Sequence, residues 1–396
     1  MFKGKRFSLI MAALLMVGLI LSGCGSDGGG KSTSSDGGDS SGGGKGGDTI
    51  KIGVSVPTTG PSAAEGKDMA NGAELAAKHI NEAGGVLGKD IELVMVDDAC
   101  DPQQAVTGAN KLVQDEVHIV VGHYCSAAAL PASGVLHKAG IPTIMVAANS
   151  PQLPEQGYDN LFFINSMVFD QGKRVADYVN EHDMKNLVLI HDNSDYARDL
   201  ADITKELHEK NGGKVVAFEA INPEEKDFGA IATKIKSLNP DATYFTGFYN
   251  AGGLIMKQFK QKGVTGPFIA GDGNPTEPFV EVAGEKDAEG VILSQAVTIN
   301  YVDTPEAKAF VEEYKDTYGN NPLTFGHRHY DGIRLAADAI ERVGDETDKE
   351  ALIKALSETK DFPAFGETYT FKEDGTRENA DFLLIQLNNG VFEIVE

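Results

Sequence analysis

The chain has 396 residues, and 59 acidic against 35 basic residues give it a formal net charge of −24 at pH 7. A surface of this sign repels nucleic acid and anionic lipid, which excludes proteins that bind either one through basic patches. The length allows two ordinary domains with substantial cores.

The first residues have the pattern of an export signal. Three basic residues among the first six precede an apolar run from Phe7 to Leu21, and Cys24 closes the motif "LSGC". A run of about 15 residues is shorter than the roughly 20 that a membrane-spanning helix requires. The motif resembles a bacterial lipobox, so we expect 1–23 to be a lipoprotein signal peptide and Cys24 to be lipidated. Cleavage by an ordinary signal peptidase, with a free Cys24 thiol, is the alternative.

The segment 24–47 has the composition of a tether. After Cys24 it consists almost entirely of Gly, Ser, Asp and Lys, and it has no apolar side chain. Such a segment cannot form a core, so we expect a disordered linker. As a flexible coil it would span about 25 Å, enough to hold a folded body just off a membrane.

Beyond residue 48, short runs of β-branched residues alternate with amphipathic stretches. Strands are expected at 50–56, 91–97, 117–122, 141–146, 186–192, 214–220, 242–247 and 267–271. Helices are expected at 66–85, 101–116, 171–182, 195–210, 228–238 and 252–262. Strict alternation indicates parallel sheets built by right-handed crossovers, and its restart after Phe169 indicates two α/β lobes. The chain should end with two more helices and two short strands, at 304–319, 325–344, 367–371 and 380–387.

In such sheets ligands bind at the carboxyl ends of the strands, so the residues just after each strand are the informative ones. These segments are "PTTGPSAAEG", "DDAC", "GHYCSAAA", "AANS", "HDNSDYARD", "GFYN" and "GDGN". Their Gly, Ser, Asn, Asp and Tyr residues suit a small polar ligand, and each segment alone is also ordinary turn chemistry. Ser126 opens a predicted helix, so its hydroxyl and the free N–H groups could hold a carboxylate or could simply cap the helix.

No catalytic or metal-binding set stands out. The sequence has no HExxH motif and no GxSxG nucleophile elbow. His191 with Asp192 is better explained as a turn at a strand end than as half of an acid–base pair. His327 and His329 point to different faces of a predicted helix, which disfavours a metal site. We therefore expect no enzymatic activity, no cofactor and no metal.

Together the segments resemble the leucine/isoleucine/valine-binding proteins of bacterial ABC importers, which are type I periplasmic binding proteins. The resemblance covers the chain from Asp48 on and is carried by "DDACDPQQAV", "GHYCS", "AANSPQL", "HDNSDYARDLA" and "EKDFGAIATKIK". It implies two Rossmann-like lobes with parallel central sheets, joined by a three-stranded hinge, that close on one amino acid. The implied division is 48–167 plus 297–375 for lobe I and 168–296 plus 376–396 for lobe II.

The resemblance also implies eight ligand-binding residues: Ser126, Ala147, Ala148, Asn149, Tyr196, Phe248, Asp272 and Glu65. Ser126, helped by Asn149, would bind the α-carboxylate of the ligand, and the Ala147 carbonyl with Asp272 would bind its ammonium group. Tyr196 and Phe248 would line the wall of lobe II. These roles agree with a physical need, because a buried zwitterion requires partners for both of its charges.

Four of these residues depart from the family pattern. Asn149 stands where the family usually has Thr, Asp272 where it has Glu, and Phe248 where it has Tyr. Glu65, in "SAAEG", stands where the family places an aromatic ring near the ligand side chain. If the Glu65 carboxylate faces the cleft, it suits a polar or cationic side chain better than leucine or valine.

Cys100 and Cys125 could form a metal site, a reactive pair or a disulfide. Each follows a predicted parallel strand, and the carboxyl ends of such strands lie on the same side, within disulfide reach. The oxidising compartment of an exported protein favours a bridge, and the two cysteines lack the CxxC spacing that is typical of a zinc site. We expect a disulfide, in agreement with the family pattern, that stiffens the turn before Ser126.

These features predict a monomeric substrate-binding lipoprotein of the cell envelope. It would be anchored outside the cytoplasmic membrane or in the periplasm and deliver an amino acid, first of all a branched-chain one, to an ABC permease. One alternative is a receptor for another small solute, such as a polar or cationic amino acid, an amide or urea. Another is a ligand-sensing subunit of a signalling system. An amide-hydrolysing enzyme is disfavoured, because no nucleophile has a base at a recognisable spacing.

Overall fold

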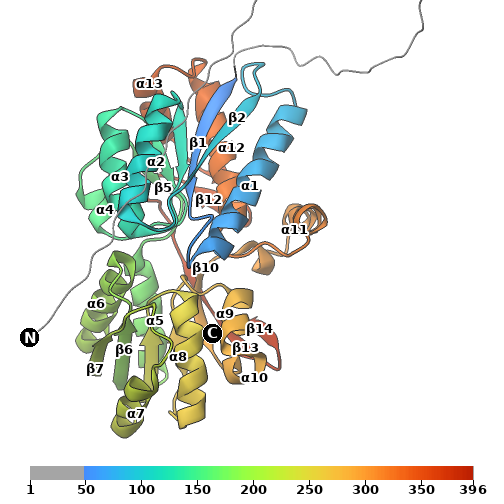
Figure 1. The fold of residues 1–396 in the computed structure, drawn as a ribbon. Helices are drawn as coiled ribbons and strands as arrows, with labels where there is room; N and C mark the ends of the chain where they lie inside the picture. Colours follow the sequence, from blue (N-terminus) through green and yellow to red (C-terminus); the bar gives the residue numbers. More distant parts are fainter. Residues whose placement is uncertain (1–48, 396) are drawn as a thin grey trace, which may run out of the picture. The chain divides into compact units, whose positions relative to one another are not determined.

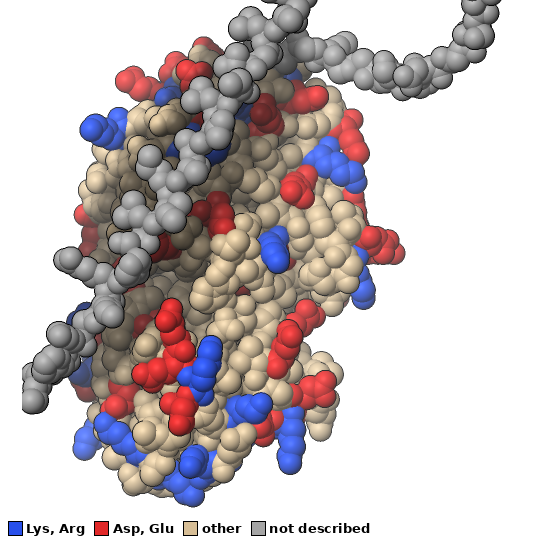
Figure 2. Space-filling view, in the orientation of Figure 1, with Lys and Arg blue, Asp and Glu red and all other residues tan. Residues whose placement is uncertain are grey.

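The computed structural model describes residues 49–395, so the predicted signal peptide, Cys24 and the predicted linker lie outside the described residues. Parallel sheets flanked by helices form two lobes, which confirms the predicted α/β class (Figure 1). Among residues 49–395 no helix has the length and apolar character needed to span a membrane. Acidic and basic side chains are interspersed over the face of the molecule drawn in Figure 2.

The first lobe is built on a parallel sheet with the strand order β2-β1-β3-β4-β5. Its strands are β1 (Ile50–Val56), β2 (Ile91–Asp97), β3 (Ile119–Gly122), β4 (Thr143–Met145) and β5 (Leu161–Phe163). Ile52 and Val54 of the central strand β1 are fully buried. Burial on both faces is typical of a parallel sheet that helices cover from two sides.

Helices follow the strands of the first lobe in turn. They are α1 (Ala63–Glu82), α2 (Pro102–Gln114), α3 (Ser126–Lys138) and α4 (Gln152–Glu155). Two helices from later in the chain complete the lobe: α12 (Gly326–Val343) packs beside α1, and α13 (Lys349–Ser357) packs on α12. The contact between α1 and α12 requires a glycine, because a Cβ at Gly72 would lie 1.9 Å from the carbonyl oxygen of Gly326.

The second lobe is built on a mixed sheet with the strand order β14-β13-β10-β9-β8-β6-β7. Its strands are β6 (Asn186–His191), β7 (Lys214–Ala220), β8 (Ala242–Phe245), β9 (Phe268–Ala270), β10 (Ile292–Ala296), β13 (Phe382–Asn388) and β14 (Val391–Ile394). The last two strands are antiparallel to their neighbours, and the others are parallel. Its helices are α5 (Val168–Glu181), α6 (Asp195–Lys210), α7 (Gly229–Leu238), α8 (Tyr249–Lys262), α9 (Thr276–Ala283) and α10 (Glu285–Ala288).

Within residues 49–395 the chain passes between the two sheets three times: after β5, after β10 and before β13. The second passage leads into η1 (Ile299–Tyr301) and α11 (Pro305–Tyr318), and the third follows a small antiparallel pair, β11 (Phe362–Pro363) and β12 (Thr368–Tyr369).

Buried arginines tie these passages together. Arg328 donates to the carbonyl of Ile164 at 2.8 Å and to that of Val297 at 3.1 Å, in the first and second passages. Arg377, near the third passage, also donates to the Ile164 carbonyl, at 3.0 Å. Glu367 forms ion pairs with both guanidinium groups, at 3.0 Å and 2.6 Å. The connections between the lobes are therefore held in register by charge-assisted hydrogen bonds.

The predicted elements agree with the structure best where strands are long. The strands expected at 50–56 and 91–97 are confirmed, whereas that expected at 141–146 contains only Thr143–Met145. The helix expected at 66–85 spans Ala63–Glu82. Strands β5, β10 and β14 were not predicted, because runs of three to five residues leave too few alternations to be distinguished from loops.

Candidate functional site

A cavity lies between the two lobes, at the carboxyl ends of the strands. It is lined by Tyr124, Ser126, Ala147, Asn149, Tyr196, Phe248, Asp272, Gly273 and Phe325. A larger depression beside Lys51 and His118 lies at the amino ends of β1 and β3, away from the edge where α/β sheets bind ligands.

Six of the eight predicted ligand residues line this cavity. Those of the first lobe follow β3 and β4, and those of the second follow β6, β8 and β9. The two exceptions are Ala148 and Glu65, which are buried but do not line it.

Ser126 is the first residue of α3, and its hydroxyl is held by the neighbouring loop. The Ser126 Oγ accepts hydrogen bonds from the backbone N–H of Asn149 at 3.3 Å and of Ser150 at 3.2 Å. With its lone pairs engaged, the hydroxyl is oriented to donate its proton into the cavity. The N–H groups of Ser126 and Ala127 have no intrahelical acceptor, because they belong to the first turn. This end of the cavity offers donors and the positive end of a helix dipole, which together suit an anion.

The Asn149 side chain does not contribute a hydrogen-bond donor to this anion-binding end of the cavity. Its Nδ2 donates to the Ser166 carbonyl at 3.0 Å. The residue therefore contributes its backbone N–H to the orientation of Ser126, while its side chain holds the loop.

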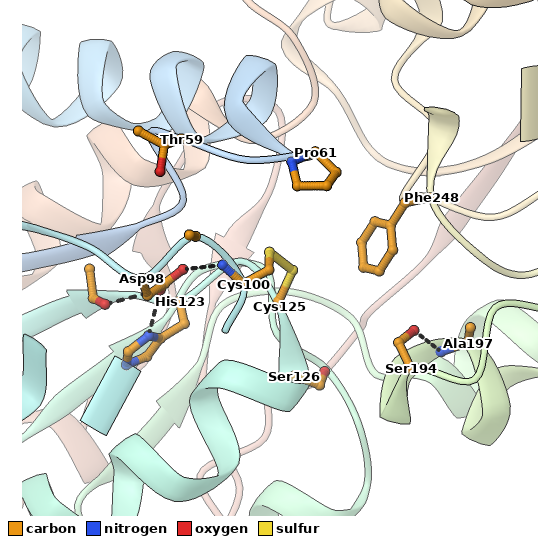
Figure 3. Close-up of a disulfide and its surroundings, with 12 residues drawn as sticks. Thr59, Pro61, Asp98, Cys100, His123, Cys125, Ser126, Ser194, Ala197 and Phe248 are labelled. Carbon is orange, nitrogen blue, oxygen red and sulfur yellow. Dashed lines mark hydrogen bonds and ion pairs between the residues drawn. A yellow bond between two sulfur atoms is a disulfide. The ribbon is translucent and has the colours of Figure 1, made fainter. Parts of the chain in front are cut away.

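A disulfide lies directly behind Ser126. Cys100 and Cys125 are bonded, with their Cα atoms 5.3 Å apart, which confirms the predicted bridge. Figure 3 shows the bridge beside the start of α3, with Phe248 of the second lobe opposite. Asp98 supports the same turn, because its carboxylate accepts from the Cys100 N–H at 3.0 Å and from the buried His123 Nδ1 at 3.2 Å. The geometry of the anion-binding end is thus fixed covalently and by buried polar contacts.

Asp272 supplies the acceptor at the opposite side of the cavity. Burial raises the pKa of its carboxyl to about 6, and hydrogen bonding to Tyr196, Asn165 and Gln171 offsets part of that rise. Ala147 adds a second acceptor. Its carbonyl oxygen accepts from Asn165 Nδ2 at 2.8 Å and keeps a second lone pair. Asp272 and Ala147 come from different lobes, so a cation bound between them would contact both.

Aromatic rings form the rest of the wall. Tyr124 lies 5.7 Å from Phe248 and 5.7 Å from Phe325, and Tyr196 lies 5.6 Å from Phe248, measured between ring centroids. These rings enclose apolar surface next to the two charged ends.

Tyr124, Gly273 and Phe325 line the cavity but were not among the predicted ligand residues. Tyr124 and Gly273 lie inside "GHYCS" and "GDGN", so the rule that ligands bind after strands contained them. Phe325 had no local signal, since it precedes α12 and reaches the cavity only because the chain returns to the first lobe.

None of the residues weighed in the sequence as an acid–base pair or a metal site (His191, Asp192, His327 and His329) lines the cavity. The Nδ1 atom of His191 accepts from the N–H of Asn193 at 3.2 Å, as in a turn. Both His327 and His329 are buried in α12, and burial lowers the pKa of His329 to about 3. Over residues 49–395 no group of three His, Cys, Asp or Glu side chains is placed to hold a metal.

Comparison with known proteins gives a consistent result. The profile of a family described as "Periplasmic binding protein" matches residues 49–391. A leucine-, isoleucine-, valine-, threonine- and alanine-binding protein of Pseudomonas aeruginosa is 33% identical over 340 residues, which is 86% of this chain and 90% of that protein.

Two solved structures extend the similarity to the fold. The branched-chain amino acid transporter substrate-binding protein LivJ of Streptococcus pneumoniae, solved with isoleucine, superposes with a TM-score of 0.81 at 33% identity, covering 88% of this chain and 99% of that one. The leucine-binding protein LivK of Thermotoga maritima gives a TM-score of 0.82 at 28% identity, over 88% and 98% of the two chains.

Proposed function

The chain belongs to the periplasmic binding protein family, and we propose that it is the substrate-binding protein of an ABC importer that holds one amino acid between its two lobes. The family consists of substrate-binding proteins and not of enzymes, as the sequence predicted.

The observation that carries this proposal is the separation of charge across the cavity. The start of α3 offers the Ser126 hydroxyl and free N–H groups, while Asp272 and the Ala147 carbonyl offer oxygen acceptors. A free amino acid carries a carboxylate and an ammonium group a short distance apart, so it satisfies both ends at once. Without such partners the burial of either charge would cost several kcal/mol.

A branched-chain amino acid is the first ligand to test. The names of the relatives above include leucine or isoleucine, and that of the Pseudomonas aeruginosa protein also valine, threonine and alanine. The rings of Tyr124, Phe248 and Phe325 supply apolar surface for an aliphatic side chain.

Lobe closure is the proposed mechanism. The ligand would contact Ser126 and Ala147 in one lobe and Tyr196, Phe248 and Asp272 in the other, so bound ligand would favour the closed form. We divide the lobes at 48–167 plus 297–375 and 168–296 plus 376–396, with the three passages between the sheets acting as the hinge. The ABC permease would recognise the closed form.

The N-terminal segment completes the proposal. We propose that 1–23 direct export, that a lipid on Cys24 anchors the protein to a membrane, and that 24–47 tether the body as a monomer within reach of the permease. The motif "LSGC" and the Gly/Ser-rich composition support this arrangement. Mass spectrometry of the N-terminal peptide tests it, since an unmodified N-terminus at another residue would contradict lipidation of Cys24.

The ligand is tested by thermal denaturation of the purified protein with the twenty amino acids, urea, short amides and small peptides. A ligand at 100 times its dissociation constant should add about 2.7 kcal/mol to the free energy of unfolding. We expect at least one amino acid to do so. If only another solute raises the melting temperature, the amino-acid assignment is wrong and the family assignment is unaffected.

A further inference from the structure

Glu65 is a buried acidic side chain that the amino-acid contacts described above do not use. It lies in the first turn of α1 and is completely buried. Burial, followed by the charge of Asp68, raises the pKa of its carboxyl well above the ordinary value. Both carboxyl oxygens lack a hydrogen-bond partner of normal geometry within residues 49–395. A buried carboxyl without hydrogen-bond partners lowers the stability of the fold, so its presence indicates a role other than stabilisation.

Asp68, one turn further along α1, is an acidic residue with a structural role. Asp68 accepts from the Tyr314 hydroxyl at 2.8 Å and from the N–H groups of Leu323 at 2.9 Å and Gly326 at 2.5 Å. It therefore anchors the start of α12 to α1. Glu65 has no comparable group of hydrogen-bond donors. The backbone N–H and hydroxyl of Thr324 lie near enough to lower the pKa of the Glu65 carboxyl, but neither forms a hydrogen bond of normal geometry with it, and the hydroxyl donates to Gln295 at 3.0 Å.

The surroundings of Glu65 connect it to the cavity. Besides burial, the charge of Glu65 raises the pKa of the Tyr124 hydroxyl, and the charge of Asp272 raises the pKa of the Glu65 carboxyl. Both Tyr124 and Asp272 line the cavity. Thr324, the close neighbour of Glu65, directly precedes Phe325, which also lines the cavity. The Tyr124 hydroxyl is buried and, like Glu65, has no partner among the described residues. An unsatisfied hydroxyl of the cavity wall, on Tyr124, thus lies within electrostatic reach of an unsatisfied carboxyl, on Glu65, that is buried behind that wall.

We propose that Glu65 and the Tyr124 hydroxyl form the side-chain end of the site and select an amino acid whose side chain donates a hydrogen bond, through a hydroxyl, amide or ammonium group. This inference rests on the proposed function and narrows its substrate class. A hydrogen-bond donor on the ligand side chain would pair with the Glu65 carboxyl or the Tyr124 hydroxyl. An aliphatic side chain would exclude water from these groups and leave them without a partner. Sites built to hydrogen-bond a ligand group discriminate strongly against analogues that lack it, because the unpaired protein group then keeps its full desolvation cost.

Isothermal titration calorimetry tests the proposal on the purified protein after removal of bound ligand by unfolding and refolding. The probes are threonine, serine, asparagine, glutamine, lysine and arginine, compared with leucine, isoleucine and valine. We expect the best donor ligand to bind at least tenfold more tightly than leucine. Glu65→Met, which keeps the length of the side chain but not its oxygens, should reduce that ratio at least tenfold.

Glu74→Gln is the matched control, because Glu74 lies on the same helix and is exposed; it should leave the ratio unchanged. If Glu65→Met does not fold, Glu65→Gln provides the same comparison, with a smaller loss for hydroxyl and amide ligands than for lysine. The inference is wrong if the wild type prefers leucine to every donor ligand, or if the ratio survives the loss of the Glu65 oxygens. Binding of no amino acid at all would instead remove the proposed function itself.

Discussion

The Ser150 hydroxyl in the first lobe donates a hydrogen bond of 2.5 Å to the Asp199 carboxylate on α6 of the second lobe. Gln152 donates to the same carboxylate oxygen at 3.0 Å. Asp199 does not line the cavity, so these contacts join the lobes without contacting the ligand. They form only when the lobes are as close as they are in this structure.

We expect Asp199→Asn to weaken ligand binding about three- to tenfold, because the closed form loses charge-assisted hydrogen bonds that each contribute roughly 1 kcal/mol at a partly exposed position. The loss should appear as faster ligand dissociation, measured by stopped-flow fluorescence or surface plasmon resonance. Asp202→Asn is the control, since Asp202 lies on the same helix and is exposed. Equal dissociation rates for Asp199→Asn and the wild type would show that these contacts do not stabilise closure.

Asp272→Asn should stabilise the empty protein while weakening its binding of amino acids. Asp272 titrates near 3.8 when unfolded and at about 6 when folded, so above pH 6 the folded protein bears the cost of a buried ionised carboxylate. At pH 8 we expect the variant to gain up to about 3 kcal/mol in free energy of unfolding. As the pH falls through about 6 the wild-type carboxyl is protonated in the folded state, and the difference between the two proteins should shrink.

Denaturant unfolding of both proteins at pH 8, 6 and 4, without ligand, measures this effect. The same carboxyl predicts that wild-type affinity for an amino acid falls below pH 6, because a protonated Asp272 no longer attracts the ammonium group. A pH-independent stability difference would contradict the assignment of that pKa to Asp272.

Ser126→Ala should weaken binding of the ligand carboxylate about 10- to 100-fold. The lost hydroxyl donates a hydrogen bond to a charged group, an interaction worth about 1.5–3 kcal/mol, while the first-turn N–H groups of α3 remain. Calorimetry with the amino acid and with its amide separates the effects, since the amide lacks the carboxylate and should lose less. Ser237→Ala is the control, because the Ser237 hydroxyl is exposed and bonds within its own helix, to the Lys234 carbonyl.

Removal of the disulfide should affect stability and binding together. Replacing Cys100 and Cys125 by Ala opens a loop of 25 residues in sequence separation and should lower the free energy of unfolding by about 3–4 kcal/mol. Because Cys125 is the N-cap of α3, affinity should fall as well. Thermal denaturation measures the change in stability, and calorimetry measures the change in affinity. The wild type is measured with and without reductant in both experiments. Unchanged affinity in the double variant would limit the bridge to a role in stability.

Much of the fold was predictable because it depends on local patterns. The β-branched runs at 50–56 and 91–97 and the amphipathic stretches after them have periods that allow one secondary structure each. Strict alternation then leaves few topologies. The rule that ligands bind after parallel strands places Ser126, Asn149, Phe248 and Asp272 at the carboxyl edge of the sheets, and all four line the cavity.

What the sequence determined by itself was therefore the class of fold, the disulfide pairing and the segments that surround the cavity, since each follows from short-range pattern and strand order, while the family resemblance singled out individual residues within those segments. Only the tertiary structure decided that Phe325 closes the cavity, that Asp199 bridges the lobes, and that Asp68 is satisfied while Glu65 is not. These facts depend on contacts between residues far apart in the chain. Hydrogen-bond satisfaction in particular is a property of three-dimensional surroundings, which two acidic residues one turn apart on the same helix do not share.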